Sequence, residues 1–145
     1  MSANVLESTS VSVTGTATDI VGAIREAAAI LESTGAVTAE YVEYMLARET
    51  SMSTYMGNFL AIPHGTNEGK DSITESALSF VRYDTPIDWN GQEVRFVVGI
   101  AGKDNGHLEI LSKIAIIFSD EDEVAKLLAA EGVEAIFALL AEVNE

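Results

Sequence analysis

Two histidines stand out among the side chains of this sequence that could act as nucleophiles. Cysteine is absent, which excludes disulfides, thiol catalysis and cysteine-based zinc sites. His64 lies in the stretch "GNFLAIPHGTNEGKD", between a proline and a glycine at the end of an apolar run. The proline restricts the backbone, and the glycine lets another backbone or an anion come close. The sequence therefore predicts a histidine presented at a strand-to-loop junction, with an ordinary loop histidine as the alternative.

His107 and Arg48 are the other candidate site residues. His107 follows "AGKDNG" and opens an expected helix. It shares a face with apolar Ile110, Leu111 and Ile114, so we expect its side chain to point inward; a buried histidine bonded to a carbonyl would do the same. Arg48 ends another expected helix, on a stripe with apolar residues, although an arginine in a last turn also simply complements the helix dipole.

These residues favour a histidine nucleophile over other kinds of catalysis. The chain has no Gly-x-Ser-x-Gly elbow, no Walker loop and no dinucleotide-binding fingerprint. Two histidines without helical spacing would need an Asp or Glu to complete a zinc site. A histidine can accept a phosphoryl group, with a second histidine and an arginine to orient it and neutralise its charge. We expect no cofactor and no metal, with a metal-binding or structural domain as the alternative.

The composition fits one globular domain spanning residues 1–145. Hydrophobic residues make up 48% of the chain and the mean hydropathy is +0.21, which is ample for a core. No apolar run reaches the ~20 residues needed to span a bilayer, and no leader pattern opens the chain, so we expect a cytoplasmic protein without membrane insertion. The net charge of −15 argues against nucleic acid as a partner.

Helical and strand patterns occur along the chain in an order that predicts a layered fold. Strands mixed with covering helices indicate a three-layer α/β or α+β domain. Residues 1–18 are expected to form a tail or an edge strand, and residues 86–92 a turn signalled by Asn90-Gly91. The expected helices cover residues 19–32, 39–49 after a Thr38 cap, a helix opened by His107 within residues 103–120, a segment capped by Ser119, and 133–143. The expected strands cover 75–84 and 93–102, with a short extended piece between Gly57 and Pro63.

Three separated motifs resemble one known family. "GNFLAIPHGTNEGKD", with "MLARE" before it and "GIAGKDNGHLEILSKIA" after it, is similar to the enzyme IIA domain of the bacterial phosphotransferase system (PTS), in its mannitol/fructose family. The pattern "PHGT.E.KD" resembles the mannitol branch most closely. The resemblance runs from about Asp19 to the C-terminus, and residues 1–18 and "DTPIDWNGQE" match only loosely. It implies a mixed sheet of about five strands between helices.

The resemblance also implies a phosphoryl relay and a role for each candidate residue. Phospho-HPr would donate to His64, which would pass the phosphoryl group to a cysteine of enzyme IIB, in a IIB or IICB mannitol transporter. His107 would hydrogen-bond near the phosphoryl group, and Arg48 would stabilise its charge. A carrier that binds two partners also needs an exposed apolar patch, for which Phe59, Leu60 and Ile62 are candidates if they are not core.

A regulatory function is the main alternative within this family. Nitrogen-type or fructose-type enzyme IIA proteins that act by binding other proteins would share the fold. Thr66, directly after His64-Gly65, favours the mannitol branch, where a basic residue would have favoured the regulator. We expect no fused IIB or IIC domain, because the chain ends soon after its last expected helix.

Overall fold

A five-stranded mixed sheet forms the centre of the protein. The computed structural model describes residues 5–103 and 107–144, with the backbone alone for Asn67, His107, Leu108, Glu142 and Asn144. The strand order is β1-β4-β5-β3-β2, with β1 parallel to β4, β3 parallel to β5, and the other neighbours antiparallel. The strands are β1 (Val11–Ser12), β2 (Tyr55–Gly57), β3 (Leu60–Ala61), β4 (Ala77–Trp89) and β5 (Gln92–Ala101).

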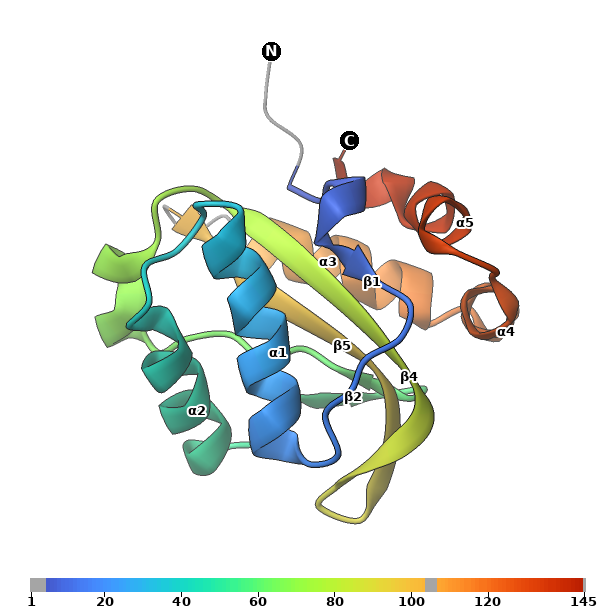
Figure 1. Cartoon of the computed structure of the whole chain (residues 1–145), viewed down its shortest axis with the longest axis horizontal. Coiled ribbons are helices and arrows are strands. Elements are labelled where there is room, and N and C mark those ends of the chain that lie inside the picture. Colours follow the sequence, from blue (N-terminus) through green and yellow to red (C-terminus); the bar gives the residue numbers. More distant parts are fainter. Residues whose placement is uncertain (1–4, 104–106, 145) are drawn as a thin grey trace.

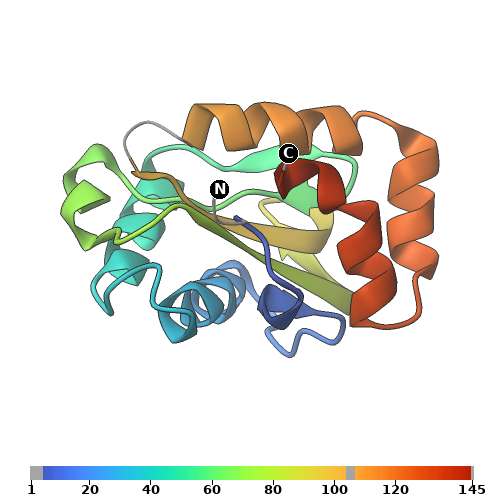
Figure 2. The same cartoon turned by 90° about the horizontal axis from the view of Figure 1, so that it is seen from above.

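Helices cover both faces of this sheet, which gives the three layers that the sequence predicted. One face carries α1 (Ile20–Ser33) and α2 (Tyr41–Ser51), and the other carries α3 and the two C-terminal helices (Figures 1 and 2). The remaining elements are α3 (His107–Phe118), α4 (Glu121–Ala129), α5 (Val133–Leu139) and the 3-10 helices η1 (Ser8–Ser10), η2 (Asn67–Ser72) and η4 (Ala141–Asn144).

The two central strands separate two hydrophobic clusters by their alternation. Phe80 of β4 and Val98 of β5 pack with α3, α4 and α5, whereas Val81 and Val97 pack with α1 and α2. Successive side chains on a strand point to opposite faces, so a nearly continuous apolar strand serves both clusters. The prediction of a buried central strand for residues 93–102 is confirmed.

The predicted helix starts are correct for α1 and shifted for α2 and α4. Asp19 caps α1, with its Oδ1 accepting from the amide of Gly22 at 2.8 Å. In contrast, α2 begins at Tyr41 and its N-cap residue is Glu40, so Thr38 is not the cap. Asp120, not Ser119, caps α4 through its side chain. At α4 the Asp120 carboxylate accepts from the amide of Asp122 at 2.9 Å, whereas Glu40 makes no capping bond to α2 through its side chain.

The prediction that residues 86–92 form a turn is wrong for most of that segment. Strand β4 continues to Trp89, and only Asn90 and Gly91, with φ of 55° and 94°, form a two-residue turn into β5. Ile87 and Trp89 are fully buried while Asp88 between them is exposed. A register shift between Arg82 and Ile87 accommodates the irregular stretch that contains the proline.

The short strand β3 carries the chain toward the candidate site. A tight turn joins β2 to β3, in which Asn58 and Phe59 both have positive φ and Asn58 donates to the carbonyl of Phe118 at 2.6 Å. After β3, His64 pairs alongside Ile100 in a parallel bridge, and the amide of Ile100 donates to the carbonyl of Pro63 at 3.0 Å. His64 therefore lies beside the carboxyl end of β5.

Candidate active site

A backbone carbonyl two residues earlier in the chain fixes the tautomer of His64. Its Nδ1 lies 2.9 Å from the carbonyl oxygen of Ile62. A carbonyl oxygen only accepts hydrogen bonds, so this contact assigns the proton to Nδ1 and the lone pair of the neutral ring to Nε2. Ile62 is only 6% exposed, and Pro63 follows it, so the accepting carbonyl is itself fixed. The side chain of His64 is half-buried and Nε2 is the nucleophilic atom of this tautomer.

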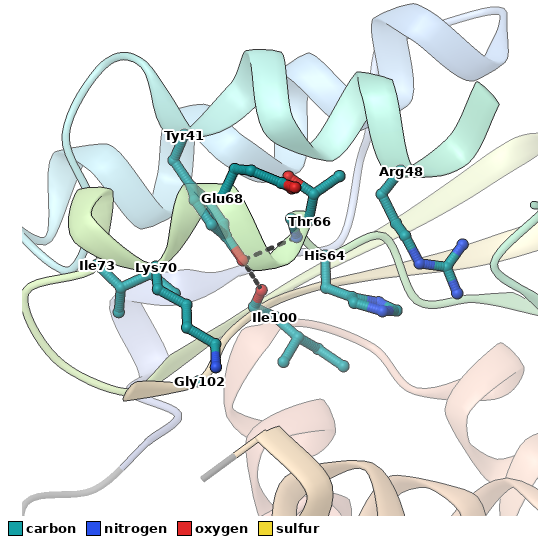
Figure 3. A pocket seen from close by; sticks show the side chains of 10 residues that line it. Tyr41, Arg48, His64, Thr66, Glu68, Lys70, Ile73, Ile100 and Gly102 are labelled. Carbon is teal, nitrogen blue, oxygen red and sulfur yellow. Dashed lines mark hydrogen bonds between the residues drawn. The ribbon is translucent and has the colours of Figure 1, made fainter. Parts of the chain in front are cut away.

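Tyr41 of α2 supports the residue that follows His64. Its hydroxyl accepts from the amide of Gly65 at 2.9 Å and donates to the carbonyl of Ile100 at 2.9 Å (Figure 3). Burial raises the pKa of the Tyr41 phenol, against the opposing effect of the Gly65 amide, so the hydroxyl keeps its proton. A Cβ at Gly65 would lie 2.6 Å from a Tyr41 ring carbon. Glycine is therefore required here by the close approach of this ring.

Arg48 approaches the same cavity from the last turn of α2. Its Nη1 donates to the carbonyl of Met52, just past the helix end, at 2.7 Å. This contact braces the side chain across the helix terminus, where a cation also complements the helix dipole. Figure 3 shows the guanidinium of Arg48 and the ring of His64 extending toward the same open space. Two of the residues predicted from the sequence are thus brought together at one cavity.

The cavity has a volume of about 290 Å³ and contains groups that the sequence analysis did not select. Lys70 and Glu68, from η2, lie along its wall with Tyr41. In Figure 3 the Lys70 side chain extends toward Gly102, on the opposite side of Ile100 from Arg48. Lys70 and Glu68 belong to the motif that carries the family resemblance. They line the cavity because η2 lies against α2, which the motif itself does not indicate. The lining residues are Tyr41, Arg48, His64, Gly65, Thr66, Glu68, Lys70, Ile73, Ile100 and Gly102.

Two further expectations have different outcomes. His107 opens α3, as predicted, but its side chain lies outside the described residues. The apolar residues proposed for a docking patch belong to the core instead, because Leu60 and Ile62 are buried and Phe59 packs half-buried against the same cluster. Large apolar side chains that are exposed include Met52 at 66%, directly after α2, and Met56 at 44%, in β2.

A helix able to cross a membrane and a cluster of metal-binding side chains are both absent from the described residues. Among them, no helix combines the length and apolar character that crossing a membrane requires. In the same part of the chain, no group of three or more His, Asp or Glu side chains is arranged to hold a metal ion. The polar side chains that line the cavity are the imidazole of His64, the cationic groups of Arg48 and Lys70, the carboxylate of Glu68 and the hydroxyls of Tyr41 and Thr66.

Comparisons with known proteins identify the family of this chain. Residues 4–143 match the model of the family described as "Phosphoenolpyruvate-dependent sugar phosphotransferase system, EIIA 2". The chain is 48% identical over 145 residues, covering both chains completely, to the mannitol-specific phosphotransferase enzyme IIA component of Halalkalibacterium halodurans. It is 46% identical over 122 residues to the protein of the same name from Staphylococcus aureus, covering 84% of this chain and 85% of the relative.

Solved structures from Escherichia coli share the fold. The enzyme IIA in a complex of mannitol IIA with phosphorylated mannitol IIB has a TM-score of 0.87 at 29% identity, covering 94% of this chain and 99% of the other. The crystal structure of mannitol IIA has a TM-score of 0.85 at 30% identity, covering 92% and 97%. The fold and the histidine cavity thus define a phosphotransferase component. This chain belongs to the EIIA 2 family of the phosphoenolpyruvate-dependent sugar phosphotransferase system, as its motifs predicted.

Proposed function

We propose that this protein is the phosphoryl carrier of a mannitol phosphotransferase system, with His64 as the residue that carries the phosphoryl group. The single observation that supports this role best is the 2.9 Å contact between Nδ1 of His64 and the carbonyl of Ile62. It directs the lone pair of the ring to Nε2, at a cavity that contains two cationic side chains. Both features suit attack on an anionic phosphoryl group.

The transfer requires no proton relay at His64. Nε2 attacks the phosphorus of a phosphohistidine on the donor protein, the donor N–P bond breaks, and its electron pair returns to the donor imidazole. Nδ1 keeps its proton throughout, hydrogen-bonded to Ile62, which stabilises the positive charge that builds on the ring as the new N–P bond forms. In the second step a thiolate attacks phosphorus, the Nε2–P bond breaks, and an S–P bond forms.

Arg48 and His107 have supporting roles in this proposal. Arg48 stabilises the charge on the equatorial phosphoryl oxygens, because its guanidinium extends toward the cavity that His64 lines. His107 hydrogen-bonds near the phosphoryl group, a role carried over from the resemblance of its motif. Positioning and charge compensation are the main contributions that a protein makes to phosphoryl transfer.

The partners follow from the relay. The donor is phospho-HPr, and the acceptor is the cysteine of a mannitol-specific enzyme IIB, alone or fused in a IICB transporter. The names of the relatives support mannitol as the transported sugar, and the E. coli complex of IIA with phosphorylated IIB supports the acceptor. We infer a cytoplasmic location, since the relay begins with phosphoenolpyruvate, a metabolite of the cytoplasm.

Phosphorylation with purified proteins tests the proposal directly. The chain is incubated with phosphoenolpyruvate, enzyme I and HPr, and the modified residue is mapped. We expect one phosphoryl group per chain, labile in acid and stable in base, and none on His64→Ala. Phosphorylation of His64→Ala at the wild-type rate, or no phosphorylation of the wild type, contradicts the proposed mechanism. Onward transfer is then measured with mannitol IIB and, for comparison, with IIB proteins of other sugars.

A further inference from the structure

The carboxylate of Glu49 accepts three hydrogen bonds at the end of α2, next to Arg48 in the chain. Its Oε2 accepts from the Thr54 amide at 3.0 Å and from Nε1 of Trp89 at 2.9 Å. Its Oε1 accepts from the Thr54 hydroxyl at 2.5 Å. Trp89 is fully buried and Thr54 is 5% exposed, so the donors have little access to water. One side chain therefore connects α2, the segment that leaves it, and the end of β4.

This anchor fixes the segment that braces Arg48. Residues 52–54 connect α2 to β2, and Thr54 at the end of the segment is held by Glu49 through two bonds. Met52 lies two residues before Thr54. Its amide donates to the carbonyl of Arg48 at 3.1 Å, and its carbonyl accepts from the Arg48 guanidinium at 2.7 Å. The position of the Met52 carbonyl, which accepts from Arg48, therefore depends on the bonds that hold Thr54 in place.

The same anchor reaches His64 through the backbone. The carbonyl of Thr54 accepts from the amide of Ile62 at 3.0 Å. The carbonyl of Ile62 in turn accepts from Nδ1 of His64 at 2.9 Å. A shift of Thr54 would therefore move the peptide that sets the tautomer and the direction of the imidazole. Arg48 lies on α2 and His64 follows β3, but the positions of both side chains depend on Thr54.

We propose that Glu49 is a positioning residue for phosphoryl transfer. Through its bonds to Thr54, it keeps the side chains of Arg48 and His64 in the correct positions relative to one another. The inference rests on the proposed function of His64. Glu49 is not among the residues that line the cavity, so it acts through the residues that do. Its contribution is geometric: what the network needs at position 49 is acceptor oxygens at the right place, not negative charge.

Two substitutions at position 49 separate geometry from charge. Glu49→Ala removes every acceptor and leaves the Trp89 and Thr54 donors unpaired. Because small misplacements in a site that works by positioning are costly, we expect about a 10- to 100-fold slower single-turnover phosphorylation from phospho-HPr. Glu49→Gln keeps one acceptor oxygen for the Trp89 and Thr54 N–H groups, and its amide can donate to the Thr54 hydroxyl, so we expect it to stay close to wild type.

The His64 tautomer gives a readout that does not depend on transfer. In ¹⁵N NMR spectra of the unphosphorylated protein, we expect the Nδ1–H signature for wild type and Glu49→Gln, and a mixture of tautomers for Glu49→Ala. Thr54→Val, which is nearly isosteric and removes only the hydroxyl donor, is expected to give an intermediate loss of rate. It keeps the test decisive if Glu49→Ala folds poorly.

Glu26→Ala provides the matched control. Glu26 is also a helix carboxylate that accepts several hydrogen bonds, from Thr16, Ala17 and Tyr83, but it does not line the cavity. We expect it to lower stability and leave the rate unchanged. A wild-type rate and tautomer in Glu49→Ala, equal slowing in Glu49→Gln and Glu49→Ala, or equal slowing in Glu26→Ala would overturn the proposal. Failure of the proposed function gives a different result, because His64→Ala would then still be phosphorylated or the wild type would not be phosphorylated at all.

Discussion

Tyr41 links two backbone segments at the site, the residue after His64 and the end of β5. Its hydroxyl bridges the amide of Gly65 and the carbonyl of Ile100, each at 2.9 Å. Its ring lies so close to Gly65 that any side chain there would collide with it. The glycine after the histidine is therefore a packing requirement of Tyr41, rather than only a way to leave room for phosphate.

Tyr41→Phe tests this link. The substitution keeps the ring against Gly65 but leaves the Gly65 amide and the Ile100 carbonyl without the partner that the hydroxyl supplies. Buried groups that lose a partner typically cost about 1–3 kcal/mol. We expect that loss in the free energy of unfolding, measured in denaturant, together with faster hydrogen exchange at the Gly65 amide. Unchanged exchange at Gly65 would show that the bridge does not order this loop.

The sequence indicated the candidate site residues but not all of the residues that surround them. His64, with proline and glycine beside it, and Arg48, at a helix end, could be selected from local pattern and resemblance. Lys70 and Tyr41 could not, because their place at the cavity depends on η2 and α2 lying against one another and against the end of β5. Contacts between segments so far apart leave no periodic signal in the chain.

At the scale of elements, α1 is fastened to the segment before it by Glu26. Burial alone would raise the pKa of Glu26, but hydrogen bonds from Tyr83, Thr16 and Ala17 favour the charged form and together hold the pKa below its ordinary value of 4.5. Burial, followed by the bond to Glu26, raises the pKa of Tyr83, so the phenol remains a donor. The charged carboxylate thus stabilises the folded state more than the unfolded state.

The direction of this shift predicts how stability depends on pH. A group whose pKa falls on folding contributes stability above its unfolded pKa and loses it as the pH drops through the folded value. We expect Glu26→Gln to unfold about 1 kcal/mol more easily at neutral pH, a modest figure because the site is partly exposed. The difference should shrink as the pH falls below about 4.5. Denaturant titrations across acidic pH measure it, and a gap that persists in acid would contradict the assignment.

The strand elements show where local signals mislead. Asn90-Gly91 correctly predicted the β4–β5 turn, but the polar and proline-containing stretch before it suggested a long loop. The buried side chains of Ile87 and Trp89 alternate with the exposed Asp88, which is the pattern of a strand. This pattern can be assigned to β4 only when the register shift after Arg82 is known. A bulge resets which residues face inward, so alternation counted from the start of the strand fails across it.

At the scale of the whole molecule, charge is distributed unevenly between the surface and the site. The protein has a net charge of −15 and only 8 Lys and Arg residues. Four of them pair with carboxylates: Arg25, Arg95, Lys113 and Lys126. In the described part of the chain, neither Arg48 nor Lys70 has a carboxylate within ion-pair distance, and both line the cavity of His64. In the same part of the chain, the other two basic residues without a carboxylate partner, Arg82 and Lys103, donate to backbone carbonyls away from this cavity. Two of the four basic residues that lack a carboxylate partner there therefore lie where an anionic phosphoryl group would approach His64 in the proposed mechanism.

Lys70→Gln tests the contribution of the second cation. Lys70 is exposed and its ammonium is a point charge, so it acts on the approach of the phosphoryl group more than on its final position. We expect phosphorylation from phospho-HPr to slow about 3- to 10-fold at low ionic strength, with the difference from wild type narrowing as salt screens the charge. Single-turnover rates measured over a range of salt concentrations give both quantities.

Lys126→Gln is the matched control, because it removes the same charge from a residue of α4 that pairs with Glu123 at 3.3 Å and does not line the cavity. If net charge governed the encounter, both variants would slow transfer equally at low salt. If the local field at the cavity governs it, only Lys70→Gln will slow, because Lys126 lies away from the cavity and its charge is already paired with that of Glu123. The second outcome is expected, because Arg48 and Lys70 both line the cavity where the phosphoryl group would arrive in the proposed mechanism.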